Sequence, residues 1–180
     1  MDFLELARIR ESVRSYSDTV VERKKLERCI EAARLAPSAC NSQPWKFIIV
    51  DNPAQKEKVA RATFGRVVSF NQFSLQAPVI VACISEPPNF PASIGELIKN
   101  KKYRWMDLGI AAEHFCLQAT QEDLGTCILG WFEEKEIKKI LEVPMKSKVG
   151  LLITVGYKKE ETIRTKKRKT FSEICSYNKY

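Results

Sequence analysis

The sequence contains a single histidine, His114, and only seven glycines. A His-centred triad or a His-rich metal site cannot be assembled from one histidine, and the only acid beside it in the sequence is Glu113. His114 is therefore a poor candidate for a catalytic base, and no metal site is predicted. The glycines form no G-x-G-x-x-G motif, so the sequence carries no Rossmann fingerprint for a dinucleotide.

The six cysteines form no C-x-x-C pair, which argues against a zinc site and a thioredoxin-type motif. Cys29, Cys83 and Cys116 lie within apolar patterns and are expected to be reduced core residues. No apolar run approaches the roughly 18 residues of a membrane span. The N-terminal segment is amphipathic and acidic, unlike a secretion signal, so a cytoplasmic protein without membrane contact is expected.

The composition is that of a folded protein, with 180 residues, 44% hydrophobic and 29% charged. One domain over 1–180 is expected, with 157–180 as a C-terminal extension. The net charge is +8, and the segment from Tyr157 onward carries eight Lys or Arg and three Glu. This basic tail is consistent with solubility or loose attraction to polyanions, and also with neutralisation of a phosphate. No aromatic interleaving or recognisable module supports a nucleic-acid partner.

Hydrophobic periodicity predicts one α+β domain. A capping box of Asp2 and Glu5 begins a short helix expected to end near Ser12. The segment 149–157 is apolar on both sides, which is typical of a central strand in a sheet covered by helices. No internal repeat interrupts the pattern. The other expected elements are helices over about 21–36, 53–65, 103–122 and 137–141, a helical turn at 92–99, and strands over 46–50 and 78–84.

Three polar clusters are candidates for a site that binds an anionic, aromatic ligand. The first is "RIRESVRSY", where Arg10, Ser12 and Arg14 lie at the end of the first helix. Guanidinium groups bind phosphate bidentately, and a hydroxyl can join them. Spacing alone favours the alternative of an exposed helix end with ordinary surface charges.

The second cluster is "LAPSACNSQPWKFIIV", between a helix and a strand. Ser38, Asn41 and Gln43 offer donors and acceptors beside two prolines, which suits the edge of a planar heterocycle. The alternative is a connection whose Ser and Asn bond their own backbone, and local chemistry leaves the two interpretations balanced.

The third cluster is the basic tail "TKKRKTFSE". Side chains at positions i and i+2 of an extended segment point to the same face, so Lys166 and Arg168 could reach one phosphate. A charged run is more often simply solvated, and this motif alone is weak.

The motifs together resemble the FMN-dependent nitroreductase family. They occur in the expected order over nearly the whole chain. The most specific is "APSACNSQPW". The others are "RESVRSY", "APVIVACI", "MDLGIAAEHFCLQATQEDLGTCILGW", "VGLLITVGY" and "KKRKTFSEI".

This resemblance implies a nitroreductase-like α+β fold with a central mixed sheet flanked by helices, and a homodimer whose C-terminal extension wraps the partner. Two FMN sites are implied at the subunit interface. Arg14 is implied at the N1/O2 edge of the flavin, where a positive charge raises its potential. The other implied contacts are Arg10, Ser12, Lys166 and Arg168 with the phosphate, Ser38, Ala39 and Asn41 with the flavin of the other subunit, Asn71 with the pyrimidine edge, and the backbone of Leu129 and Gly130 with the ring near N5.

The implied activity is ping-pong oxidoreduction, in which NADH or NADPH delivers hydride to FMN N5 and an electron-poor nitroaromatic or quinone takes the electrons. No side chain need act as a catalytic nucleophile. Reductive dehalogenating and flavin-destroying relatives share these contacts, and the segment 85–105, which has no clear match, is where such specialisation would lie. A basic polyanion-binding protein is the alternative of another class.

Overall fold

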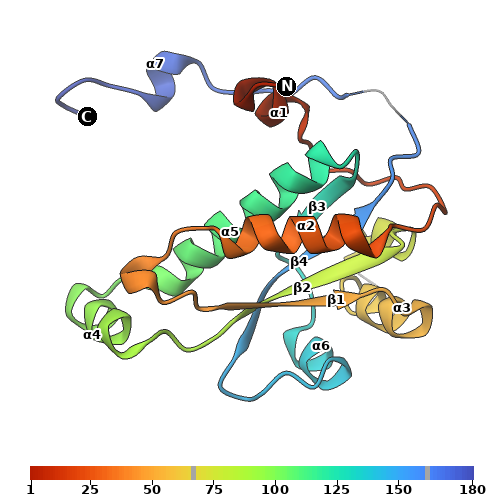
Figure 1. Cartoon of the computed structure of the whole chain (residues 1–180), viewed down its shortest axis with the longest axis horizontal. Helices are drawn as coiled ribbons and strands as arrows, with labels where there is room; N and C mark the ends of the chain where they lie inside the picture. Colours follow the sequence, from red (N-terminus) through yellow and green to blue (C-terminus); the bar gives the residue numbers. More distant parts are fainter. Residues whose placement is uncertain (66–67, 161–162) are drawn as a thin grey trace.

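Four strands form one sheet at the centre of the structure, which is a computed structural model describing residues 1–65, 68–160 and 163–180 (Figure 1). The strand order is β1-β2-β4-β3, and neighbouring strands pair antiparallel. β4 lies inside the sheet, as predicted from its two apolar sides. β3 was not anticipated as a strand, because its apolar run, at 127–129, is only three residues long. The strands are β1 Trp45–Val50, β2 Val79–Ser85, β3 Gly125–Leu129 and β4 Lys148–Gly156.

Two pairs of helices cover the two faces of this sheet, α2 with α5 and α3 with α6 (Figure 1). Val79 and Val81 of β2 belong to the apolar cluster with α2 and α5, whereas Ile80 and Ala82 pack in the cluster with α3 and α6. This alternation follows from the period of two in a strand. Among the described residues, no helix is long and apolar enough to cross a membrane. The helices are α1 Phe3–Ile9, α2 Arg23–Arg34, α3 Pro53–Arg61, α4 Phe90–Lys99, α5 Tyr103–Gln121, α6 Glu134–Ile140 and α7 Phe171–Ile174, with 3-10 turns η1 Ala39–Asn41 and η2 Gln72–Leu75.

Two helices end earlier than the sequence suggested. α1 ends at Ile9 and not near Ser12, because the backbone leaves the helix at Arg10 and Ser12 forms a bridge with Thr126 of β3. α3 ends at Arg61 and not at Gly65. The hydroxyl of Thr63 donates to the carbonyl of Ala60 (2.7 Å), which satisfies one of the last carbonyls of this helix.

The segment after α1 runs beside β3. The amide of Val13 donates to the carbonyl of Thr126 (2.8 Å), and the bridge between Ser12 and Thr126 is parallel. The sheet was expected to be mixed, but its four strands pair antiparallel, and parallel pairing among the described residues is confined to this bridge. The approach is close, since a Cβ added at Gly125 would lie 2.7 Å from Val13 Cγ2. The absence of a side chain at Gly125 therefore permits this close approach of the segment 10–14 to β3.

Candidate functional site

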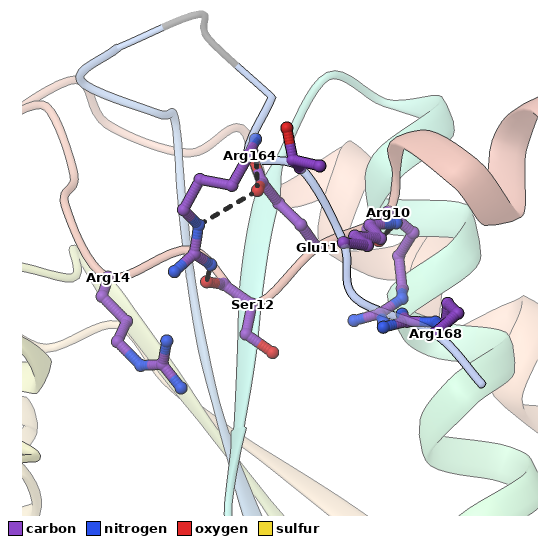
Figure 2. Close-up of a pocket in the computed structure, with 8 residues that line it drawn as sticks. Arg10, Glu11, Ser12, Arg14, Arg164 and Arg168 are labelled. Atoms are coloured by element: carbon purple, nitrogen blue, oxygen red, sulfur yellow. Dashed lines mark hydrogen bonds and ion pairs between the residues drawn. The ribbon is translucent and has the colours of Figure 1, made fainter.

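A pocket of about 270 Å³ lies between the segment after α1 and the C-terminal tail. Figure 2 shows the guanidinium groups of Arg10 and Arg168 together on one side of Ser12, with Arg14 on the other side. The structure thus brings together five predicted site residues from the two ends of the chain. The residues that line the pocket are Arg10, Glu11, Ser12, Arg14, Arg164, Thr165, Lys166 and Arg168.

The pocket carries an excess of positive charge, because five of its eight lining residues are Arg or Lys and one is acidic. Partial burial lowers the pKa of Lys166, and the charges of Arg10 and Arg168 lower it further. A lysine pKa lowered by neighbouring arginines indicates a positive local potential, which favours an anion. Arg10 is partly compensated, since its Nε lies 3.3 Å from Glu113 Oε1 of α5.

Lys166 has a contact set that spacing did not predict. Its Nζ donates to the carbonyls of Ala7 (3.1 Å), Arg8 and Arg10, at the end of α1. The last carbonyls of a helix have no partner within the helix, and a cation is favourable there. A lysine ammonium has three donors, so these three carbonyls engage all of them. Lys166 therefore joins the tail to α1 and contributes its charge to the pocket.

Arg14 is exposed and lies over an aromatic ring. Its guanidinium carbon is 5.9 Å from the ring centroid of Phe73, a residue of η2 that lies two positions after Asn71. A guanidinium stacked in this way is oriented without its donors being used. Arg14 also lines a second pocket beside the first, which includes Lys158 and Glu160.

The loop with Ser38, Ala39 and Asn41 does not line this pocket. It follows the C-terminal end of α2, whereas the segment 10–14 precedes its N-terminal end (Figure 1). Ser38 Oγ accepts from the amide of Gln43 (2.9 Å), so the connector interpretation holds for that hydroxyl. Both carboxylate oxygens of Asp107 in α5 accept from the amide of Ala39 at 3.2 Å.

The same loop has an unusual backbone. Cys40, Asn41 and Gln43 have φ values of 52°, 50° and 47°, in the left-handed region that residues other than glycine rarely adopt. Such conformations persist only where the surroundings enforce them, and they cluster at functional sites. The contacts from Asp107 and Ser38 supply that enforcement.

Asn71 is buried, and its amide joins two elements near the end of β3. Its Nδ2 donates to the carbonyls of Thr63 (3.3 Å) and Trp131 (3.1 Å). Leu129 ends β3 as a buried residue and Gly130 follows it, exposed. Asn71 thereby fixes the turn after Gly130, whose backbone was predicted to lie near a flavin.

Glu11, Arg164 and Thr165 line the pocket and were missed by sequence reasoning. The same-face argument that paired positions 166 and 168 extends to 164, so the spacing held a signal for Arg164. Nothing local marks Glu11, because the partners of its carboxylate lie in the tail.

The chemistry of the pocket fits a phosphate group. Guanidinium and hydroxyl donors line the pocket. The volume of the pocket lies below the range of roughly 300–1,000 Å³ for pockets that enclose a whole drug-sized ligand. The pocket therefore suits the anionic end of a larger molecule.

Comparison with known proteins gives one family. The nitroreductase family model matches residues 7–157. A nitroreductase family protein from Clostridium novyi NT is 29% identical, with a TM-score of 0.78 over 92% of this chain and 89% of that chain. An FMN-dependent nitroreductase from Clostridium difficile R20291 is 26% identical, with a TM-score of 0.81 over 99% and 100%. An oxygen-insensitive NADPH nitroreductase of Helicobacter pylori is 27% identical over 181 residues, 83% of this chain and 84% of the relative. With this match over most of its length, and with the predicted nitroreductase-like α+β fold confirmed, the chain belongs to the nitroreductase family.

Proposed function

We propose that this chain is an FMN-dependent NAD(P)H oxidoreductase that transfers electrons to an electron-poor acceptor such as a nitroaromatic or a quinone. Family membership supports the oxidoreductase class and the cofactor. The observation that carries the proposal for this chain is the pocket in which Arg10, Ser12 and Arg14 meet Lys166 and Arg168.

Arg10, Ser12 and Arg168 bind the phosphate of FMN in this proposal. Nη1 of Arg168 donates to the carbonyl of Lys167 (2.9 Å), which leaves further guanidinium donors for a ligand. Charge-assisted hydrogen bonds of this kind are about twice as strong as neutral ones. Lys166 adds positive charge from its place at the end of α1.

Arg14 serves the ring side of the same ligand. Phe73 supports its guanidinium, which would place a positive charge beside the N1/O2 edge and favour negative charge on the ring. Asn71 and the backbone of Leu129 and Gly130 are proposed to lie along the pyrimidine edge and near N5.

A homodimer completes the site in this proposal, because Ser38, Ala39 and Asn41 lie away from their own pocket and would reach the flavin of the other subunit. Exposed apolar side chains on α1 and α5 support association. Phe3 and Ile110 line a largely apolar groove of about 500 Å³ between α1, α2 and α5. Exposed apolar surfaces are common sites of protein–protein contact.

Bound FMN supplies hydride acceptance at N5 from NAD(P)H and electron delivery to the second substrate in a ping-pong sequence. The chain itself binds, orients and tunes the cofactor. This chemistry requires no proton transfer by His114. Its Nδ1 lies 3.3 Å from the carbonyl oxygen of Ala32 in α2.

Purified protein is expected to be yellow and to release a flavin on denaturation. The release is checked by absorbance and by chromatography against FMN and riboflavin standards. A colourless preparation that refuses added FMN, and instead binds polyanions with a steep salt dependence, would establish the basic binding protein in place of the enzyme.

Replacing Arg14 by Ala is expected to weaken FMN binding about tenfold and to slow reduction by NAD(P)H, because the proposed charge at the ring edge is lost. Flavin fluorescence titration and stopped-flow absorbance measure the two effects. Arg8→Ala is the matched control, since Arg8 is an exposed cation of α1 that does not line the pocket. Unchanged affinity and unchanged reduction in Arg14→Ala would remove this residue from the site.

A further inference from the structure

Glu11 is a buried acid at the border of a strongly basic pocket, and its side chain is only 7% exposed. One oxygen lies 3.2 Å from Lys158 Nζ, and the other lies 3.3 Å from Nε and from the backbone amide of Arg164. Figure 2 shows the Arg164 side chain folded over Glu11 and Ser12. The carboxylate thus receives donors from two positions of the C-terminal tail.

These contacts balance the charge of the carboxylate. Burial alone would raise the pKa of Glu11, but the hydrogen bonds and charges of Lys158 and Arg164 outweigh it, and the pKa lies below its ordinary value. Glu11 is therefore ionised at neutral pH, and its carboxylate pairs with two cations of the tail, Lys158 and Arg164. A carboxylate neutralised in this way repels a neighbouring anion less than a free one.

The tail depends on such side-chain contacts for its position. Residues 163–170 form no helix or strand. Two points hold this stretch against the start of the chain. Arg164 bonds Glu11 and, through Nη2, the carbonyl of Ser12, and Lys166 bonds the carbonyls at the end of α1. Arg168 lies two residues after Lys166. Among the described residues it forms no hydrogen bond with the segment 7–12.

We propose that Glu11 is a positioning residue, which holds residues 164–168 against residues 10–12 so that Arg168 completes the phosphate site, and that an anion in this site in turn orders the tail. The proposal deepens the proposed function and rests on it. Coupling of this kind is reciprocal, so the factor by which an ordered tail raises anion affinity is the factor by which the anion favours the ordered tail.

The test compares Glu11→Gln with the wild type. Gln has nearly the same shape but lacks the charge that holds Lys158 and Arg164. The variant is expected to bind FMN about tenfold more weakly and riboflavin, which lacks the phosphate, with unchanged affinity. A general folding defect would weaken both ligands alike, so the difference between them isolates the positioning role.

A second measurement follows the tail directly. Trypsin cleaves after the Lys and Arg residues at 164–169, and cleavage tracks the fraction of time the tail is open. Inorganic phosphate is expected to slow this cleavage in the wild type, and Glu11→Gln is expected to be cleaved faster and to lose most of that protection. Mass spectrometry assigns the cut sites.

Glu160→Gln is the matched control, because Glu160 is an acid of the same tail that lines the neighbouring pocket. It removes one negative charge near the site without removing an anchor. If Glu11 acted only by repulsion, both variants would bind FMN more tightly, which would overturn the proposal, as would cleavage in Glu11→Gln at the wild-type rate. A wild type that binds neither FMN nor riboflavin would instead contradict the proposed function.

Discussion

Replacing Arg10 and Arg168 together by Gln is expected to weaken FMN binding by about 10² to 10⁴-fold while leaving riboflavin affinity nearly unchanged. Each guanidinium is proposed to donate charge-assisted hydrogen bonds to the phosphate, and a hydrogen bond to a charged group contributes about 1.5–3 kcal/mol. The two guanidinium groups lie together on one side of the pocket (Figure 2), so the loss of both leaves that side without guanidinium donors. Isothermal titration of the apoprotein with the two flavins measures the difference.

Two controls separate this role from general charge. The double variant Lys167→Gln with Lys169→Gln removes the same net charge from flanking tail residues that do not line the pocket. Glu113→Gln removes the partner of Arg10 and tests whether that ion pair matters by itself. An equal loss of FMN and riboflavin affinity in the arginine double variant, or the same loss in the lysine variant, would show that the pocket does not bind the phosphate.

Replacing Phe115 by Ala is expected to lower the free energy of unfolding by about 3–5 kcal/mol. Phe115 of α5 is fully buried among side chains of α2, β2 and β4, and its ring stacks on Phe47 with a centroid separation of 6.4 Å. Removal of the ring leaves a cavity that rigid neighbouring elements fill only in part. Urea denaturation at one fixed protein concentration, without added flavin, measures the change.

Phe90→Ala provides the comparison for this core substitution. Phe90 begins α4 and is 78% exposed, so its truncation is expected to change the free energy of unfolding by less than about 0.5 kcal/mol. If Phe90→Ala destabilised the protein as much as Phe115→Ala, the exposed face of α4 would be covered by a partner in solution.

Hydrophobic periodicity predicted the helices that pack against the sheet through one continuous apolar face. The helix expected over 103–122 is α5, Tyr103–Gln121, because its buried apolar positions recur at helical spacing from Leu108 to Ala119. The helix expected to continue to Ser12 stops at Ile9, because Ser12 pairs with Thr126, which is distant in the sequence. A local pattern holds no information about such a contact.

The candidate site was likewise predictable from the sequence only in part. The sequence placed Arg10 and Ser12 in one polar cluster and Lys166 and Arg168 in another, and only the family resemblance joined them. The structure places all four around one pocket. The partners of Glu11 and of Lys166 depend on how the tail crosses the start of the chain, so spacing could not assign them. The roles of Ser38, Ala39 and Asn41 depend on a second subunit and stay a prediction.

The bridge between Ser12 and Thr126 has a consequence for aggregation. β3 is an edge strand of the sheet, and an uncovered edge can pair with a strand of another molecule. The segment that carries Arg10 and Arg14 occupies that edge through the hydrogen bond from Val13 to Thr126. Variants that loosen this segment are therefore expected to lose solubility together with the cofactor, because the segment proposed to bind the ligand also shields the edge.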